Sequence, residues 1–235
     1  MVIAGAHIGI AVDGGMHSTS LNSNSKRLGD VMLAPIQTPL SSSFRIEDFL
    51  QVELDEHRRV FEDIHRDISV SFGRVLQIIE ESVRQGGKVL LFGNGGSAAE
   101  AQHIAAELTV RYKANRAAIA ALALTTDTSA LTACANDMGF DALFSRQVEA
   151  LARQEDVVIG ISTSGRSANV LAGLREARKK GARTIGLAGG DGGDMAELCD
   201  AIIVVSSTVT ARVQEMHIFI GHILCKALEQ RLGLV

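Results

Sequence analysis

Residues 88–107 read KVLLFGNGGSAAEAQHIAAE, and the fold prediction starts from this stretch. An apolar run, Val89–Phe92, ends in a glycine-rich turn at residues 93–97, and the turn opens onto a helical segment. A run that is apolar at every position is typical of a strand buried on both faces of a parallel sheet. The stretch therefore predicts a strand, a tight turn and a helix, in that order.

The same succession recurs along the rest of the chain. Short apolar runs alternate with helical segments such as 168–180, which is the pattern of βαβ units with helices on both sides of a sheet. The predicted strands are Lys88–Phe92, Ile119–Leu124, Val157–Ile161, Thr184–Leu187 and Ile202–Val205. We therefore predict an α/β fold: a three-layer, doubly wound, five-stranded parallel sheet.

The residues before the first strand divide into two parts. Residues 1–44 are rich in Gly, Ser, Asn and Thr and lack sustained periodicity, which predicts a disordered or loosely attached leader. From Ile46 to Val83, apolar residues recur at helical spacing, and Gly86 and Gly87 follow as a stop signal. We predict two amphipathic N-terminal helices here, within a single domain at 45–235.

Composition excludes several classes of protein. The chain of 235 residues is 46% hydrophobic and 21% charged, which is enough for one sizeable core. Its net charge of −4 gives no electrostatic reason to expect nucleic-acid or membrane binding. Residues 1–15 make a poor signal peptide, and the longest apolar run, Ala117–Leu124, is too short to span a bilayer. We expect a soluble, cytoplasmic protein whose three cysteines are reduced and mostly buried.

Three polar, glycine-containing turns follow predicted strands, at 93–97, 162–167 and 189–193. Ligands of such sheets bind at the carboxyl ends of the strands. In Ser162-Thr-Ser-Gly-Arg-Ser167, four hydroxyls and a glycine precede a helix, and this combination suits a phosphate group. An ordinary N-cap is the alternative interpretation, but it needs only one hydroxyl. The loop lacks the Gly-Lys-Ser/Thr signature of a P-loop.

The turn at 93–97 differs from a dinucleotide-binding turn. Its glycine spacing is not G-x-G-x-x-G, and no acidic residue directly ends the next predicted strand. We expect its backbone amides to lie close to a sugar chain.

Histidine and carboxylate side chains indicate a second kind of chemistry. His103 and Glu107 are four residues apart and share a helix face, so they form either half a metal site or a simple hydrogen-bonded pair. Gln214 and His222 supply further ligand types, but eight helical residues separate them by about 12 Å. Either that helix is interrupted, or the contacts are stretched, or the site draws residues from neighbouring subunits. We interpret His217 as structural.

These segments together resemble a known family. The chain resembles SIS (sugar isomerase) domain proteins, and among them the phosphoheptose isomerases, from about Phe49 to the C-terminus. The matching segments are 93–107, 123–127, 136–137, 144–147, 160–165 and 214–222. The resemblance implies the flavodoxin-like SIS fold and the interconversion of sedoheptulose 7-phosphate and D-glycero-D-manno-heptose 7-phosphate, in heptose biosynthesis for lipopolysaccharide or related glycans.

The resemblance also implies roles for individual residues. It implies that one zinc ion per subunit is bound by His103, Glu107, Gln214 and His222, with Glu107 and His222 taking part in proton transfer. It implies a homotetramer with active sites between subunits. The implied substrate contacts are Asn94, Gly95, Gly96, Ser97, Glu107, Thr126, Asp127 and Gln214 for the sugar, and Ser162, Thr163, Ser164 and Ser167 for the phosphate.

Two alternatives share the same resemblance. A non-catalytic SIS protein that binds a replication initiator keeps the fold but lacks a histidine at the position of His222, which is present here. A sugar-phosphate-sensing transcriptional regulator would need a DNA-binding domain, and residues 1–44 are too short, too polar and too little basic for one.

Overall fold

The computed structural model describes residues 44–235, except for the side chains of 65–67. The predicted leader therefore lies outside the described residues, apart from its last position. In chain order the elements are α1 (Ile46–Arg84), β1 (Val89–Gly93), α2 (Gly96–Thr109), β2 (Ala121–Ala123), α3 (Thr128–Asp137), the 3-10 turn η1 (Phe140–Ala142), α4 (Leu143–Leu151), β3 (Val157–Ser162), α5 (Ala168–Lys179), β4 (Arg183–Gly189), α6 (Met195–Leu198), β5 (Ala201–Val205) and α7 (Thr210–Arg231).

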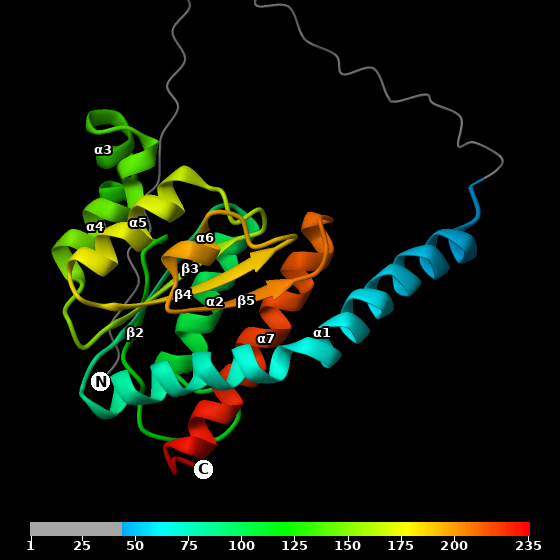
Figure 1. Ribbon diagram of the computed structural model, residues 1–235, viewed down its shortest axis with the longest axis horizontal. Coiled ribbons are helices and arrows are strands. Elements are labelled where there is room, and N and C mark those ends of the chain that lie inside the picture. The colour runs from blue at the N-terminus through cyan, green and yellow to red at the C-terminus, as the bar shows by residue number, and fades with distance from the viewer. Residues whose placement is uncertain (1–43) are drawn as a thin grey trace, which may run out of the picture. The chain divides into compact units, whose positions relative to one another are not determined.

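The five strands form one parallel sheet in the order β2-β1-β3-β4-β5 (Figure 1). This order is that of the flavodoxin-like folds, so the predicted sheet is confirmed. Strand β2 is shorter at its start than the predicted Ile119–Leu124, because the N–H of Ile119 donates to the carbonyl of Leu108 at the end of α2 instead of pairing with β1.

Helices cover both faces of the sheet, as the alternation predicted. Successive strand residues point to opposite faces, so Leu91 joins the core under α1, α2 and α7, whereas Leu90 and Phe92 join the core under α3 to α6. The rings of Phe92 and Phe144 stack there with their centroids 4.8 Å apart. The sheet is therefore the middle of three layers.

The two predicted N-terminal helices are wrong in number, because α1 is one continuous helix of 39 residues. Both prolines of the chain precede Ile46, and the one glycine inside α1 is Gly73. A single interior glycine costs about 1 kcal/mol relative to alanine, which weakens a helix but does not end it. The helix stops where Gly86 takes a positive φ of 80°.

The topology fixes where a ligand can bind. Strands β1 and β3 are neighbours, and the chain leaves them toward α2 on one face and α5 on the other, so a crevice forms at their carboxyl ends. The turns 93–97 and 162–167 both begin at this edge. No helix among residues 44–235 combines the length and apolar character needed to cross a membrane.

Candidate active site

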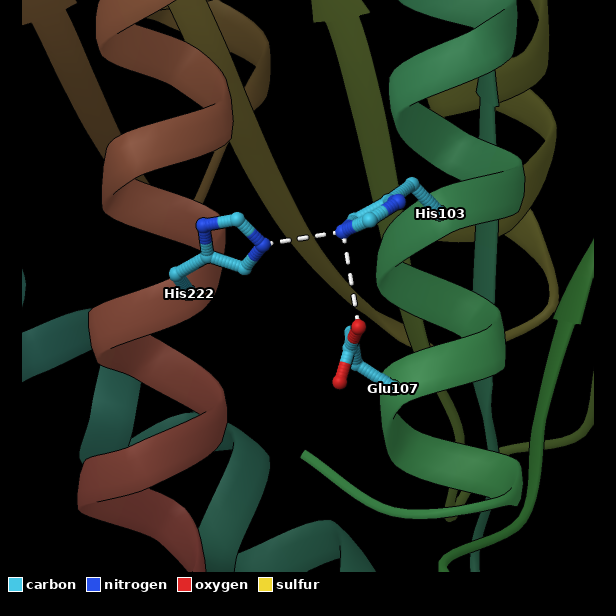
Figure 2. A group of neighbouring side chains, drawn as sticks. All are labelled: His103, Glu107 and His222. Atoms are coloured by element: carbon cyan, nitrogen blue, oxygen red, sulfur yellow. Dashed lines mark hydrogen bonds and ion pairs between the residues drawn. The ribbon is translucent and has the colours of Figure 1, made fainter. Parts of the chain in front are cut away.

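Helices α2 and α7 lie against each other and run in the same direction (Figures 1 and 2). Near their starts, a Cβ atom at Gly96 would clash with the side-chain amide of Gln214. Farther along, a Cβ at Gly221 would lie 2.7 Å from the side chain of Ile104. Glycine at these two positions lets the helices approach closely, which brings the histidine that follows Gly221 within reach of α2.

Figure 2 shows the resulting group of three side chains, His103 and Glu107 from α2 and His222 from α7. The Nε2 atoms of the two histidines are 2.8 Å apart, and Nε2 of His103 lies 3.4 Å from Oε1 of Glu107. The two imidazole rings meet nearly edge to face, at 71°. Three of the four predicted metal ligands therefore converge within one chain.

The chemistry of this triad fits a divalent metal ion. One ligand atom from each side chain lies within 4.8 Å of the others. Oε2 of Glu107 is buried without a hydrogen-bond partner, so its lone pairs are not used within the described residues. Two imidazoles and one carboxylate form a donor set that catalytic zinc sites use, and it leaves a coordination position open.

Gln214, the fourth predicted ligand, lies apart from the triad in this chain. Helix α7 is uninterrupted from Thr210 to Arg231, so the eight residues from Gln214 to His222 rise by about 12 Å. The structure thus excludes the first of the three alternatives left open by the sequence, an interrupted helix. The amide of Gln214 instead packs against Gly96, beside the turn predicted to contact the sugar.

Arg116 holds the end of α2 that carries Glu107. The sequence patterns did not identify Arg116. Its guanidinium donates to the backbone carbonyls of Glu107 and Leu108 at 2.7 Å each, and to the carboxylate of Glu229 at 2.8 Å. The side chains of Arg116 and Glu229 are 0% and 3% exposed. A buried ion pair therefore fixes the end of α2 that carries Glu107. Burial also raises the pKa of the nearby Cys225 thiol to about 12, so this cysteine stays protonated.

The predicted phosphate loop places its hydroxyls together. Oγ of Ser162 lies 3.0 Å from Oγ of Ser167 and 3.5 Å from Oγ of Ser164. Ser167 occupies the N-cap position of α5, but its side chain makes no capping hydrogen bond. The hydroxyl cluster is therefore not explained by capping, which was the alternative interpretation, and through Ser167 it lies at the N-terminus of α5.

An open pocket of about 750 Å³ adjoins this loop. It is lined by Thr163 and Ser164 of the loop, and also by Ser206, Ser207, Thr208 and Thr210, which sequence reasoning missed. Their signal was present, as a run of hydroxyl residues directly after a predicted strand. Arg166 and Asp191 also line the pocket, and their two-pronged ion pair at 2.8–2.9 Å holds the pKa of the Asp191 carboxyl well below its usual range.

A pair of asparagines joins the predicted sugar turn, 93–97, to the helix that follows the predicted phosphate loop, 162–167. Asn94 and Asn169 exchange two side-chain hydrogen bonds, each of 2.8 Å, and Asn169 is buried. Asn169 was not identified from the sequence. The pair fixes the separation between the start of α2 and the start of α5 at the β1–β3 crevice.

The remaining predicted substrate contacts are Asp127, Thr126, Ser97 and Gly95. The carboxylate of Asp127 caps α3 by accepting from the N–H of Ala130 at 3.0 Å, and the Thr126 hydroxyl lies 3.4 Å from the carbonyl of Ala123. Ser97 is buried at the first turn of α2. Gly95 has a positive φ of 56°, a conformation that favours glycine. The turn 93–97 therefore presents bare backbone at this position. A substrate role for these four residues stays a prediction.

Comparison with known proteins identifies the family. The SIS domain family matches residues 54–189. A phosphoheptose isomerase from Paramagnetospirillum magneticum is 55% identical over 77% of this chain and 94% of its own length. The chain belongs to the phosphoheptose isomerases. Solved phosphoheptose isomerase structures from Neisseria gonorrhoeae (40% identity, TM-score 0.75) and Francisella tularensis (30%, 0.77) match 79% and 80% of this chain and the whole of each of those chains.

The membership of the phosphoheptose isomerase family agrees with the fold and with the resemblance found in the sequence. The SIS match includes both His103 and Glu107 as well as the phosphate loop, whereas α7 lies beyond it. The similarity to the relatives, which covers 77–79% of this chain, is therefore what extends the family assignment beyond the SIS domain alone.

Proposed function

We propose that this chain interconverts sedoheptulose 7-phosphate and D-glycero-D-manno-heptose 7-phosphate. The observation that carries the proposal is the triad of His103, Glu107 and His222, in a chain that belongs to the phosphoheptose isomerases. The hydroxyl cluster at 162–167 supplies a site for the phosphate, and the turn 93–97 lies beside it for the sugar chain.

Ketose–aldose isomerisation moves one proton between carbons and one between oxygens. In our proposal the Glu107 carboxylate removes a proton from C1 of the ketose, which gives an enediolate, and returns a proton to C2. His222 takes the proton from the C1 oxygen and gives one to the C2 oxygen, so that no atom is gained or lost. Glu107 suits the first role because one of its carboxylate oxygens has no hydrogen-bond partner.

We further propose that the triad holds Zn²⁺. A bound zinc ion would polarise the substrate carbonyl and stabilise negative charge on the oxygens. In this proposal His103, Glu107 and His222 come from one chain, and Gln214 reaches the ion of a neighbouring subunit, because it lies about 12 Å along α7 from His222.

A homotetramer with sites between subunits is the assembly we propose, in the cytoplasm, where sugar phosphates are made and used. Besides the position of Gln214, large apolar side chains exposed in the first turns of α1 support it, among them Ile46, Leu50, Val52 and Leu54. A neighbouring α1 helix would bury these side chains.

The relatives named above are isomerases, so the similarity supports the enzyme and not the initiator-binding alternative. His222, the residue that separates the two in sequence, takes its place in the triad.

The test is an assay with sedoheptulose 7-phosphate before and after metal chelation. We expect aldose 7-phosphate to form, the rate to fall when metal is removed, and added Zn²⁺ to restore it. A protein that binds the sugar phosphate but forms no aldose at any metal content would refute the isomerase proposal.

A further inference from the structure

His217, interpreted from the sequence as structural, is part of a buried polar contact that the proposed reaction does not use. Its imidazole is 0% exposed and lies on α7 between Gln214 and His222. Glu100, on α2 one turn before His103, is also buried, and its Oε2 lies 3.7 Å from Nδ1 of His217. Among the described residues, neither of these two atoms has a hydrogen-bond partner.

The other ring nitrogen of His217, Nε2, indicates which nitrogen of the neutral ring carries the hydrogen. Nε2 lies 3.1 Å from the carbonyl oxygen of Ala188, the penultimate residue of β4. A carbonyl can only accept, so Nε2 carries a hydrogen. If the imidazole were neutral and the carboxylate ionised, a lone pair of Nδ1 would face a lone pair of Oε2, and the buried pair would carry an uncompensated negative charge. One additional proton removes both penalties.

Glu100 and His217 connect three elements of the fold. Glu100 belongs to α2, His217 to α7, and the carbonyl of Ala188 to β4. The metal ligands His103 and His222 lie farther along the same two helices, where a small shift of α2 along α7 would separate them. The buried ion-pair contact between Glu100 and His217 opposes such a shift.

We propose that Glu100 and His217 share one buried proton and act as positioning residues that hold α2 and α7 in the register required by the metal triad. The effect on catalysis rests on the proposed isomerase function, whereas the shared proton and its effect on metal binding do not. Outer contacts of this kind orient the ligands of metal sites and affect their affinity.

The first measurement needs neither substrate nor metal. In full-length, chelator-treated protein labelled with ¹⁵N-histidine, we expect a proton resonance far downfield of the amide range that correlates with Nδ1 of His217. It should be lost in Glu100→Gln and in Glu100→Met. Its absence from the wild-type protein would overturn the proposal, whether or not the chain is an isomerase, and this arm holds even if a variant does not fold.

The second measurement compares two substitutions of Glu100. Methionine is close in shape but leaves Nδ1 without a donor, so Glu100→Met should weaken Zn²⁺ binding, measured by calorimetry, and lower kcat, each by about tenfold. The amide of Glu100→Gln can donate to Nδ1, so this variant should stay close to wild type. KM should change little in both, because the phosphate loop lies on other elements.

Glu80→Gln is the matched control. Glu80 is also a buried glutamate, 9% exposed, and it joins α1 to the end of α7 through Arg231, away from the triad. This variant should lower the Tm without changing Zn²⁺ affinity or kcat. If Glu100→Met folds and behaves in the same way, the contact is merely structural and the positioning role is refuted.

Discussion

Glu107 is the residue on which most of the proposed chemistry depends. One of its carboxylate oxygens contacts His103, the other is buried without a partner, and Arg116 holds its backbone carbonyl. A group held in this way can act on a substrate carbon without first leaving another hydrogen bond.

Glu107→Gln tests this role. The amide is close in size to the carboxylate but cannot take up a proton, so kcat should fall by about 10²–10⁴-fold while the sugar phosphate still binds. Turnover and sedoheptulose 7-phosphate binding would be measured on the same preparation, with the exposed Glu149→Gln as control. A fully active Glu107→Gln enzyme would contradict the assignment of Glu107 as the base.

At the scale of single residues, the sequence identified those whose chemistry is visible in a short pattern. His103 and Glu107 share a helix face, and His222 stood out as a further ligand type near the C-terminus; the structure brings the three together. Arg116, Asn169 and the buried contacts of His217 were missed because each depends on a partner distant in the sequence. Neither periodicity nor spacing within a segment indicates which distant side chain a buried polar group will meet.

At the scale of elements, the candidate active site includes two strand-to-helix turns at the β1–β3 crevice. The strands and the helix at 168–180 were predictable, because buried strands are apolar at nearly every position. The continuity of α1 was not predictable, because its apolar pattern fits two shorter helices as well as one long helix. No residue inside α1 ends the helix. The asparagine pair between the turns has no local signature at all.

Asn169→Ala tests the connection between the turns. Loss of both hydrogen bonds to Asn94 should let the sugar turn and the phosphate loop move apart, and kcat/KM for sedoheptulose 7-phosphate should fall by about tenfold. Asn115→Ala, which alters an exposed asparagine bonded to Arg111, is the control. Unchanged kinetics in a folded Asn169→Ala protein would show that the pair does not position the substrate.

At the scale of the whole molecule, the first turns of α1 expose several large apolar side chains. Leu50 and Leu54 are one helical turn apart and 50% and 59% exposed, so they lie on the same face. Burial of such side chains between subunits would contribute to the stability of an assembly.

Leu50→Asp combined with Leu54→Asp should therefore give a smaller species than the wild-type protein in size-exclusion chromatography with light scattering. Because Gln214 is proposed to act across subunits, turnover should fall when the assembly dissociates. Val235→Asp places one such charge at an exposed apolar position at the end of the chain and should change neither mass nor turnover. A double variant that keeps its full mass would count against α1 as the interface.

The close, parallel packing of α2 and α7 constrains chain length as well as residue type. Contacts succeed one another in step along both helices, from Gly96 and Gln214 to His103 and His222. Each residue turns a helix by about 100°, so one residue inserted between Gln214 and His222 would carry the imidazole away from α2. Insertions and deletions within these stretches of the two helices would therefore separate the paired residues.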